Sequence, residues 1–194
     1  MWDQRYAADE YVYGTRPNDF LASVVDRLPM GRVLCLAEGE GRNAVFLAEQ
    51  GFEVTAVDSS AVGLAKARKL AGQRGVHIET VIADLTHYEI VPESRDVLVA
   101  IYCHLPPPLR RAVHAQAVAG LRPGGAFVLE AYTPAQLQHG TGGPPVVELM
   151  MTLDGLRDEL AGLHFEHALE TERDIQEGRF HAGVGAVVQV LAYK

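Results

Sequence analysis

A glycine-rich turn with two acidic residues follows an apolar run near the start of the chain. The apolar residues 33–36 lead into the segment Ala37-Glu38-Gly39-Glu40-Gly41-Arg42-Asn43-Ala44. A buried strand that passes through a Gly-x-Gly turn into a helix lets a ligand approach the backbone closely, beside a helix N-terminus. The pattern therefore predicts a site for a nucleotide-derived cofactor around residues 38–41.

Charge separates the two cofactors that fit such a turn. Gly39-x-Gly41-x-x-Ala44 also matches the dinucleotide fingerprint, in which a pyrophosphate lies at the turn. Glu38 and Glu40 flank Gly39, and like charges about 4 Å apart repel by about 1 kcal/mol in water and about 4 kcal/mol at an effective dielectric constant near 20. A dinucleotide is disfavoured, whereas the sulfonium and ammonium groups of S-adenosylmethionine would be attracted. The alternative interpretation is that both glutamates are solvated loop residues.

Two aspartates end the next two predicted strands. Asp58 closes the strand at 53–57 and is followed by Ser59, while Asp84 follows the strand at 76–82. An acid in the first position accepts hydrogen bonds from both ribose hydroxyls of a bound nucleoside. An acid in the second would accept from an adenine amine. The alternatives are a helix N-cap for Asp58, a role that Ser59 could share, and a turn residue for Asp84.

Tyr102 and His104 close the fourth predicted strand. Ligands of open α/β sheets gather outside the carboxyl ends of the strands, so we expect both side chains to line the site. His104 is the candidate general base for a hydroxyl or ammonium acceptor. A lone histidine near a strand end is, however, more often structural.

Two further segments are expected to border the acceptor. Tyr11, Tyr13 and Arg16 would form an N-terminal lid that excludes water from the reacting groups. Arg179 and His181 lie between the last two predicted strands and would reach the acceptor if the sixth strand runs parallel to the first five. A solvated hairpin is the competing interpretation.

The elements that must position these residues alternate along the chain. Apolar runs of strand length and amphipathic stretches of helix length alternate from residue 32 onward, which indicates βαβ units and a parallel sheet. Predicted strands cover 32–37, 53–57, 76–82, 95–102, 126–131, 163–170 and 184–192. Predicted helices cover 18–28 with Asn18 as N-cap, 42–50, 60–73, 107–120 and 153–160. Pro123-Gly124-Gly125 is interpreted as a turn before the fifth strand, and the last two strands should pair antiparallel because no crossover helix separates them.

Composition limits the class of protein. With 194 residues the chain is long enough for one core and too short for two ordinary domains. The net charge of −8 disfavours a nucleic-acid partner, because such binding relies on Lys and Arg. No apolar run has the length of a membrane span, and the N-terminus lacks the features of an export signal. We therefore expect a cytoplasmic protein without a membrane partner; its oligomeric state stays open.

Other kinds of site are not indicated. The remaining histidines show no pairing with Cys or acids at metal-ligand spacing, so no metal is expected. The two cysteines lie in apolar runs, which favours a reduced compartment. No Ser or Cys lies in a nucleophile-elbow pattern, which leaves covalent hydrolysis without support.

Together these features resemble the class I S-adenosylmethionine-dependent methyltransferase family. The resemblance rests on the Gly-rich turn after strand one, the acids after strands two and three, and Pro-Gly-Gly before strand five, and it covers nearly the whole chain. The segment 37–44, together with Trp2-Asp3-Gln4-Arg5-Tyr6 and residues 11–20, is more closely similar to the TehB-like and thiopurine-methyltransferase-like branch. Where the family pattern has Asp and then Gly-Cys-Gly, this chain has Cys35 and Ala37-Glu38-Gly39. That difference keeps the turn and leaves open which side chain meets the cofactor ammonium.

The resemblance implies a Rossmann-like, doubly wound, seven-stranded α/β sheet, mostly parallel with an antiparallel last strand. It also implies that the loop 38–41 surrounds the methionine portion of the cofactor, that Asp58 holds the ribose, and that Asp84 with Leu85 frames the adenine. The cofactor-binding residues we expect are Glu38, Gly39, Glu40, Gly41, Asn43, Asp58, Ser59, Asp84, Leu85 and Tyr102. The expected substrate and lid residues are Tyr11, Tyr13, Arg16, His104, Arg179 and His181.

The chain is thus expected to be one methyltransferase domain with three parts. Residues 1–28 form the lid and a helix, 32–132 the cofactor-binding core, and 133–194 the substrate-side loop, a helix and a terminal β-hairpin. The expected reaction is in-line methyl transfer from S-adenosylmethionine to a small acceptor, whether a thiol, a metalloid oxyanion or a small metabolite. The alternatives are a non-catalytic S-adenosylmethionine-binding protein and an NAD-dependent oxidoreductase.

Overall fold

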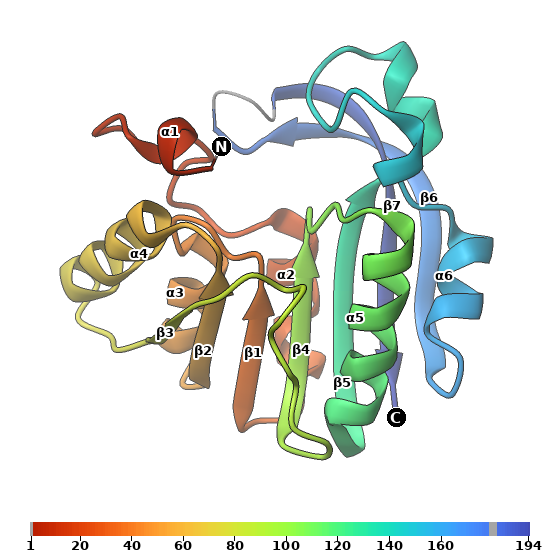
Figure 1. The fold of residues 1–194 in the computed structure, drawn as a ribbon, viewed down its shortest axis with the longest axis horizontal. Coiled ribbons are helices and arrows are strands. Elements are labelled where there is room, and N and C mark those ends of the chain that lie inside the picture. Colours follow the sequence, from red (N-terminus) through yellow and green to blue (C-terminus); the bar gives the residue numbers. More distant parts are fainter. Residues whose placement is uncertain (1, 179–181) are drawn as a thin grey trace.

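A seven-stranded sheet forms the centre of the molecule (Figure 1), with strand order β3-β2-β1-β4-β5-β7-β6. The computed structural model describes residues 2–178 and 182–194. The strands are β1 (Arg32–Leu36), β2 (Glu53–Asp58), β3 (Glu79–Ile82), β4 (Arg95–Ile101), β5 (Leu121–Tyr132), β6 (His164–Gln176) and β7 (Ala182–Tyr193).

Strand direction confirms the predicted topology. β1 to β5 pair in parallel, and β7 runs antiparallel to both β5 and β6. β6 therefore runs parallel to β5. The carboxyl ends of six strands lie at one edge of the sheet, and Glu177 and Gly178, the first residues after β6, lie there too.

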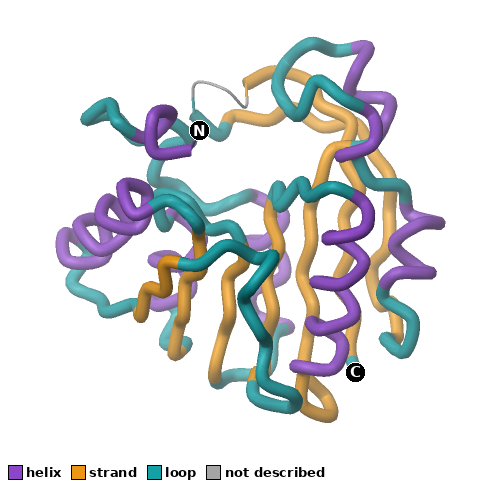
Figure 2. Tube along the Cα trace, viewed as in Figure 1, coloured by secondary structure: helices purple, strands orange, loops and turns teal. Residues whose placement is uncertain are grey.

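Helices cover both faces of the sheet (Figure 2). They are α1 (Trp2–Tyr6), α2 (Asp19–Val24), α3 (Arg42–Glu49), α4 (Ala61–Gln73), α5 (Pro107–Gly120) and α6 (Leu153–Glu159), with 3-10 turns at Val25–Arg27, Pro134–Gln138 and Val147–Leu149. Successive strand residues point to opposite faces. In β1, Val33 and Cys35 pack in the cluster with α2, α3 and α4, whereas Leu34 and Leu36 pack in the cluster with α5 and α6.

Most predicted elements are confirmed to within a residue or two. The helix at 107–120 is observed with the same bounds, and α4 begins one residue later than predicted. Asn18 is the N-cap of α2, where its side chain accepts a hydrogen bond of 2.9 Å from the Leu21 amide. The helix predicted to reach residue 28 ends at Val24 and continues as a 3-10 turn to Arg27.

Three predicted strands have the wrong extent. β3 begins at Glu79 and not at residue 76. Pro123-Gly124-Gly125 lies inside β5, because the Gly124 amide donates to the Lys194 carbonyl and the Lys194 amide to the Gly125 carbonyl. β6 extends six residues beyond the predicted end, because its polar residues 171–176 pair with residues 182–187 of β7. Residues 171–176 contain no apolar run that would predict a strand.

No helix among residues 2–178 and 182–194 is both long and apolar enough to cross a membrane.

Candidate functional site

The Gly-rich turn between β1 and α3 lies at the carboxyl edge of the sheet. Gly39 has a φ of 64°, and Gly41, the N-cap of α3, has a φ of 88°. A Cβ atom at Gly41 would lie 2.5 Å from the Cβ of Ala67 on α4, so the turn also needs glycine for close packing. Ala37 has a φ of 51°, a conformation that costs a non-glycine residue free energy. The backbone is therefore folded tightly, and the buried Tyr6 side chain packs directly against Gly39, where an added Cβ atom would lie 2.6 Å from the Tyr6 hydroxyl.

Glu38 points back into the protein and caps α3. Its carboxylate accepts hydrogen bonds from the amides of Asn43 (3.0 Å) and Ala44 (2.8 Å). Burial raises the pKa of Glu38 to about 7, and the two amide bonds and the charge of Arg42 oppose that rise. The interpretation of Glu38 as a solvated loop residue is wrong, because its carboxylate replaces the missing partners of the first helical amides.

Glu38 should make stability depend on pH. A folded-state pKa near 7, above the ordinary 4.5, gives a stabilising contribution that is complete below pH 4.5 and is lost as pH rises through 7. Relative to Glu38→Gln, the wild-type free energy of unfolding should fall by up to about 3 kcal/mol between pH 4.5 and 8. Urea denaturation of both proteins at a series of pH values measures the difference. A difference that stays constant with pH would show that the pKa of Glu38 is the same in the folded and unfolded proteins and would contradict the shift.

Glu40 contacts the N-terminal segment. Its Oε2 accepts hydrogen bonds from the backbone amides of Val12 (2.7 Å) and Tyr13 (3.4 Å), and its Oε1 lies 2.5 Å from Lys66 Nζ. Only 4% of Glu40 is exposed. Glu40 is therefore not a solvated loop residue either; it joins the turn to the segment predicted to act as a lid.

Lys66 on α4 also binds the N-terminal segment. Its ammonium donates to the carbonyl oxygens of Tyr6, Ala8 and Glu10, and the Tyr11 hydroxyl donates to the Lys66 carbonyl. Tyr13 accepts a hydrogen bond from Arg5, and Arg16 is exposed. Figure 1 shows α1 and the following loop beside α4, at the carboxyl edge. The predicted lid segment thus lies at the site; its closure over a ligand stays a prediction.

The lid segment also meets the hairpin between β6 and β7. A Cβ atom at Gly178, which has a φ of 80°, would lie 2.4 Å from the Tyr13 Cα. The predicted acceptor residues Arg179 and His181 fall outside the described residues. Their neighbours Glu177 and Gly178 lie at the carboxyl edge, because β6 runs parallel to β5 as the prediction required.

Removing the Lys66 ammonium should loosen the lid. In Lys66→Met three backbone carbonyls and Glu40 lose their cationic partner, so the amides of Val12 and Tyr13 should exchange with solvent faster, by about tenfold. Lys69→Met, an exposed position on the same helix, is the matched control and should leave exchange unchanged. Hydrogen exchange read by mass spectrometry over residues 2–18 makes the measurement. Equal exchange in both variants would contradict the assigned role of Lys66.

Asp58 lies directly beside the turn. Its Oδ2 accepts from the Gly39 amide (2.8 Å) and its Oδ1 from the Ser60 amide (2.7 Å). Burial raises the pKa of Asp58 above its ordinary value, and the amide bonds oppose the rise. The N-cap of α4 is Ser60, whose hydroxyl accepts from the Gly63 amide, so the alternative of Asp58 or Ser59 as N-cap is wrong. Ser59 is exposed beside Asp58.

Asp84 and Leu85 follow β3 at the same edge. The Ala83 amide donates to the Asp58 carbonyl, which brings the two strand ends together. The Asp84 carboxylate is exposed and accepts from the Thr86 amide (2.8 Å) and hydroxyl (2.6 Å), and these bonds lower its pKa. Asp84 therefore stabilises a turn, as the alternative interpretation predicted. Its carboxylate is also exposed at the carboxyl edge; its contact with a ligand stays a prediction. Leu85 is half-buried beside it.

Tyr102 follows β4 with a φ of 53°. Its hydroxyl donates to Glu130 Oε1 (2.8 Å), and its ring stacks on that of Tyr132 with 4.8 Å between centroids. Strained backbone at a strand end is typical of functional sites. Tyr102 is half-buried at the edge where the sequence places it.

His104 has partners at both ring nitrogens. Nδ1 lies 2.8 Å from the Leu149 carbonyl, and Nε2 lies 3.4 Å from the Tyr132 amide. Burial lowers the pKa of His104 to about 4, so the ring is neutral at pH 7. A neutral ring that donates through Nδ1 and accepts through Nε2 holds the loop after β5 against the sheet. This geometry favours the structural alternative over general-base catalysis.

A buried polar network that was not predicted from the sequence lies beside Tyr102. Glu130 is fully buried and accepts hydrogen bonds from Asn18, Tyr102, Arg173 and Gln189. Arg173 and Asn18 also contact Glu177, which pairs with Arg42 at 2.6 Å. Asn43, a predicted cofactor residue, accepts from the Asn18 amide beside it. The one feature of the sequence that could have indicated this network is Glu130, a single acidic residue in the apolar run 126–132.

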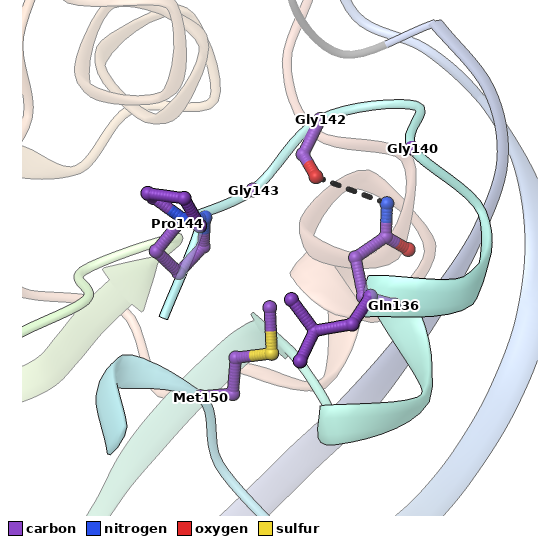
Figure 3. Close-up of a pocket in the computed structure, with 8 residues that line it drawn as sticks. Gln136, Gly140, Gly142, Gly143, Pro144 and Met150 are labelled. Carbon is purple, nitrogen blue, oxygen red and sulfur yellow. Dashed lines mark hydrogen bonds between the residues drawn. The ribbon is translucent and has the colours of Figure 1, made fainter. Parts of the chain in front are cut away.

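The loop after β5 borders an open cavity of about 270 Å³ (Figure 3). It is lined by Gln136, Leu137, Gly140, Gly142, Gly143, Pro144, Pro145 and Met150. None of these side chains is charged, and the Gln136 amide is held by Thr141, Gly142 and Ala186. Gly143 packs against the ring of Tyr132, which places the cavity wall next to the aromatic stack. The volume and lining suit a small uncharged group.

Comparison with known proteins supports the family suggested by the sequence. Residues 33–125 match the family model described as a methyltransferase domain. A comparison with curated proteins gave no match.

Several solved structures share the fold. A structure described for the conversion of a disulfide bond into a thioacetal group during echinomycin biosynthesis is 19% identical, with a TM-score of 0.78, covering 100% of this chain and 90% of that one. TehB from Haemophilus influenzae is 17% identical (TM-score 0.73), covering 100% of this chain and 65% of that one. The N-methyltransferase NodS from Bradyrhizobium japonicum WM9 is 14% identical (TM-score 0.67), covering 98% and 94%. At these identities the structures show the fold alone.

Proposed function

We propose that the chain is an S-adenosylmethionine-dependent methyltransferase of the Rossmann-like class and that it methylates a small molecule bound beside the loop after β5. The observation that carries the proposal is the uncharged cavity of about 270 Å³ next to the Tyr102–Tyr132 stack. A purely sensory or scaffolding protein would be expected to have this space filled.

The donor and acceptor groups at the edge fit S-adenosylmethionine. Asp58 offers a buried carboxylate beside the turn, which suits two ribose hydroxyls. Asp84 and Leu85 follow the neighbouring strand and would frame the adenine. Tyr102 and Asn43 border the turn from β4 and α3.

The protein's contribution would be alignment and exclusion of water. When bound, S-adenosylmethionine supplies an activated methyl group together with its own leaving group. The segment 2–18, held by Glu40 and Lys66, would cover the reacting groups, and the aromatic stack would orient the acceptor. Since both nitrogens of His104 have backbone partners, we propose an acceptor that does not depend on His104 as a base.

A thiol or a small uncharged metabolite fits the cavity lining better than a metalloid oxyanion. A charged oxyanion would lie among apolar and amide groups with no cation in the described lining. Assignment to the TehB-like branch rests on residues 2–6, 11–20 and 37–44, and on the shared fold of the Haemophilus influenzae protein. The branch and a cytoplasmic location are parts of the proposal.

Two measurements test the function. Calorimetric titration with S-adenosylhomocysteine should give micromolar binding, whereas titration with NAD should give none. A screen of small thiols, metabolites and selenite with radiolabelled S-adenosylmethionine should then transfer label to a neutral acceptor. Binding of NAD alone would overturn the cofactor assignment. Transfer to selenite but not to thiols or metabolites would overturn the acceptor class.

A further inference from the structure

Arg42 holds a charged donor without a partner inside the protein. It is the first residue of α3 and is 7% exposed. Nη2 donates to Glu177 Oε2 at 2.6 Å, but Nη1 is buried and has no hydrogen-bond partner among residues 2–178 and 182–194. Buried donors are nearly always paired, and a charged one without a partner destabilises the folded state. Such an exception calls for a ligand that completes it.

The acids around Arg42 already have cationic partners. Glu177 is shared between Arg42 and Arg173, and Glu130 pairs with Arg173. Two arginines and two glutamates make the buried part of the cluster neutral, and Arg173 also pairs with the exposed Asp19 at 3.2 Å. Nη1 of Arg42 is a buried, charged donor without a partner among the described residues, and a charged donor suits an anionic acceptor.

The guanidinium lies between the turn and the hairpin. Glu177 holds it from the hairpin side, and its charge lowers the pKa of Glu38 from the turn side. Glu38 itself is engaged with the amides of Asn43 and Ala44. Arg42 therefore places an unused donor at the end of the turn where the amino-acid tail of the cofactor would lie.

We infer that Nη1 of Arg42 binds the carboxylate of the amino-acid tail of S-adenosylmethionine; this inference rests on the proposed function. A guanidinium that uses one nitrogen for a protein carboxylate can present the other to a second carboxylate in the same plane. The carboxylate is the one anionic group of this cofactor. The side chain that meets the ammonium stays open, and Arg42 supplies a cationic residue for the opposite charge of the tail.

Ligand truncation combined with mutation tests the inference. S-adenosylhomocysteine carries the carboxylate, and 5′-methylthioadenosine lacks the entire amino-acid tail. We expect Arg42→Gln to weaken S-adenosylhomocysteine binding by about 10- to 100-fold and 5′-methylthioadenosine binding by less than about threefold. Calorimetry gives both dissociation constants without any turnover.

Because Arg42→Gln leaves Glu177 without one partner, the double variant Arg42→Gln/Glu177→Gln is the matched test, with circular dichroism to confirm folding. Glu177→Gln alone should keep the preference for S-adenosylhomocysteine. Equal weakening of both ligands in the Arg42 variants would overturn the inference and assign Arg42 a structural role. Failure of the wild-type protein to bind either ligand would instead overturn the proposed function.

Discussion

Asp58→Ala should weaken the binding of S-adenosylhomocysteine by about 100-fold or more. The carboxylate is 7% exposed and is held in place by the amides of Gly39 and Ser60. Hydrogen bonds to a charged group contribute about 1.5–3 kcal/mol each, and two ribose hydroxyls would lose their acceptor together. Every 1.4 kcal/mol is a factor of ten in affinity. Calorimetric titration of the variant measures the loss.

Two controls make the Asp58 result specific. Asp158→Ala removes an exposed carboxylate on α6 and should bind like the wild type. Asp58→Asn keeps the shape and one acceptor oxygen, so its loss should be smaller than that of Asp58→Ala. If Asp58→Ala binds as tightly as Asp158→Ala, the ribose does not lie at the end of β2.

Glu130→Gln should lower the free energy of unfolding by about 3 kcal/mol or more. Glu130 is fully buried, and its two oxygens accept from Asn18, Tyr102, Arg173 and Gln189. An amide would bring its own donors against these donors and would leave Arg173 less well neutralised. Breaking a buried ion pair on one side typically costs about 3–5 kcal/mol, a large part of the stability of an ordinary domain.

Urea denaturation and thermal unfolding measure the Glu130 effect, with an expected fall in Tm of about 10 °C. Glu172→Gln changes an exposed glutamate on β6 that pairs with His139, and it should cost less than about 1 kcal/mol. Similar losses in the two variants would mean that the network around Glu130 contributes little to stability.

The hydrogen-bond partners of the two glutamates in the Gly-rich turn could not be predicted from the sequence. Glu38 and Glu40 were recognised as the charged residues of the turn, because their spacing between glycines is local. Their actual contacts, the first amides of α3 for Glu38 and the Val12 amide and Lys66 for Glu40, were not predictable. A glutamate has several rotatable bonds, and its direction depends on donors supplied by distant parts of the chain.

The buried network around Glu130 was also not predictable, because its members are far apart in the sequence. Glu130 contacts Asn18 across 112 residues of sequence, and Asn18 contacts Glu177 across 159. Arg173 and Glu177 reach the carboxyl edge because β6 pairs with β7 and runs parallel to β5. In the sequence, Arg42 is only one residue of the Gly-rich motif. The tertiary structure alone shows that its Nη1 is buried and has no hydrogen-bond partner among the described residues.

The sequence by itself determined the order of helices and strands, the sheet class and the edge of the sheet at which the predicted site residues lie. These follow from local apolar periodicity and from the rule that parallel strands share a carboxyl edge, which placed Asp58, Asp84 and Tyr102 correctly. Tertiary structure alone decided the extent of β6, the backbone contacts of His104 and the partners of each buried charge. The physical reason is that periodicity is a property of neighbouring residues, whereas hydrogen bonds and ion pairs depend on distances between residues that only folding brings together.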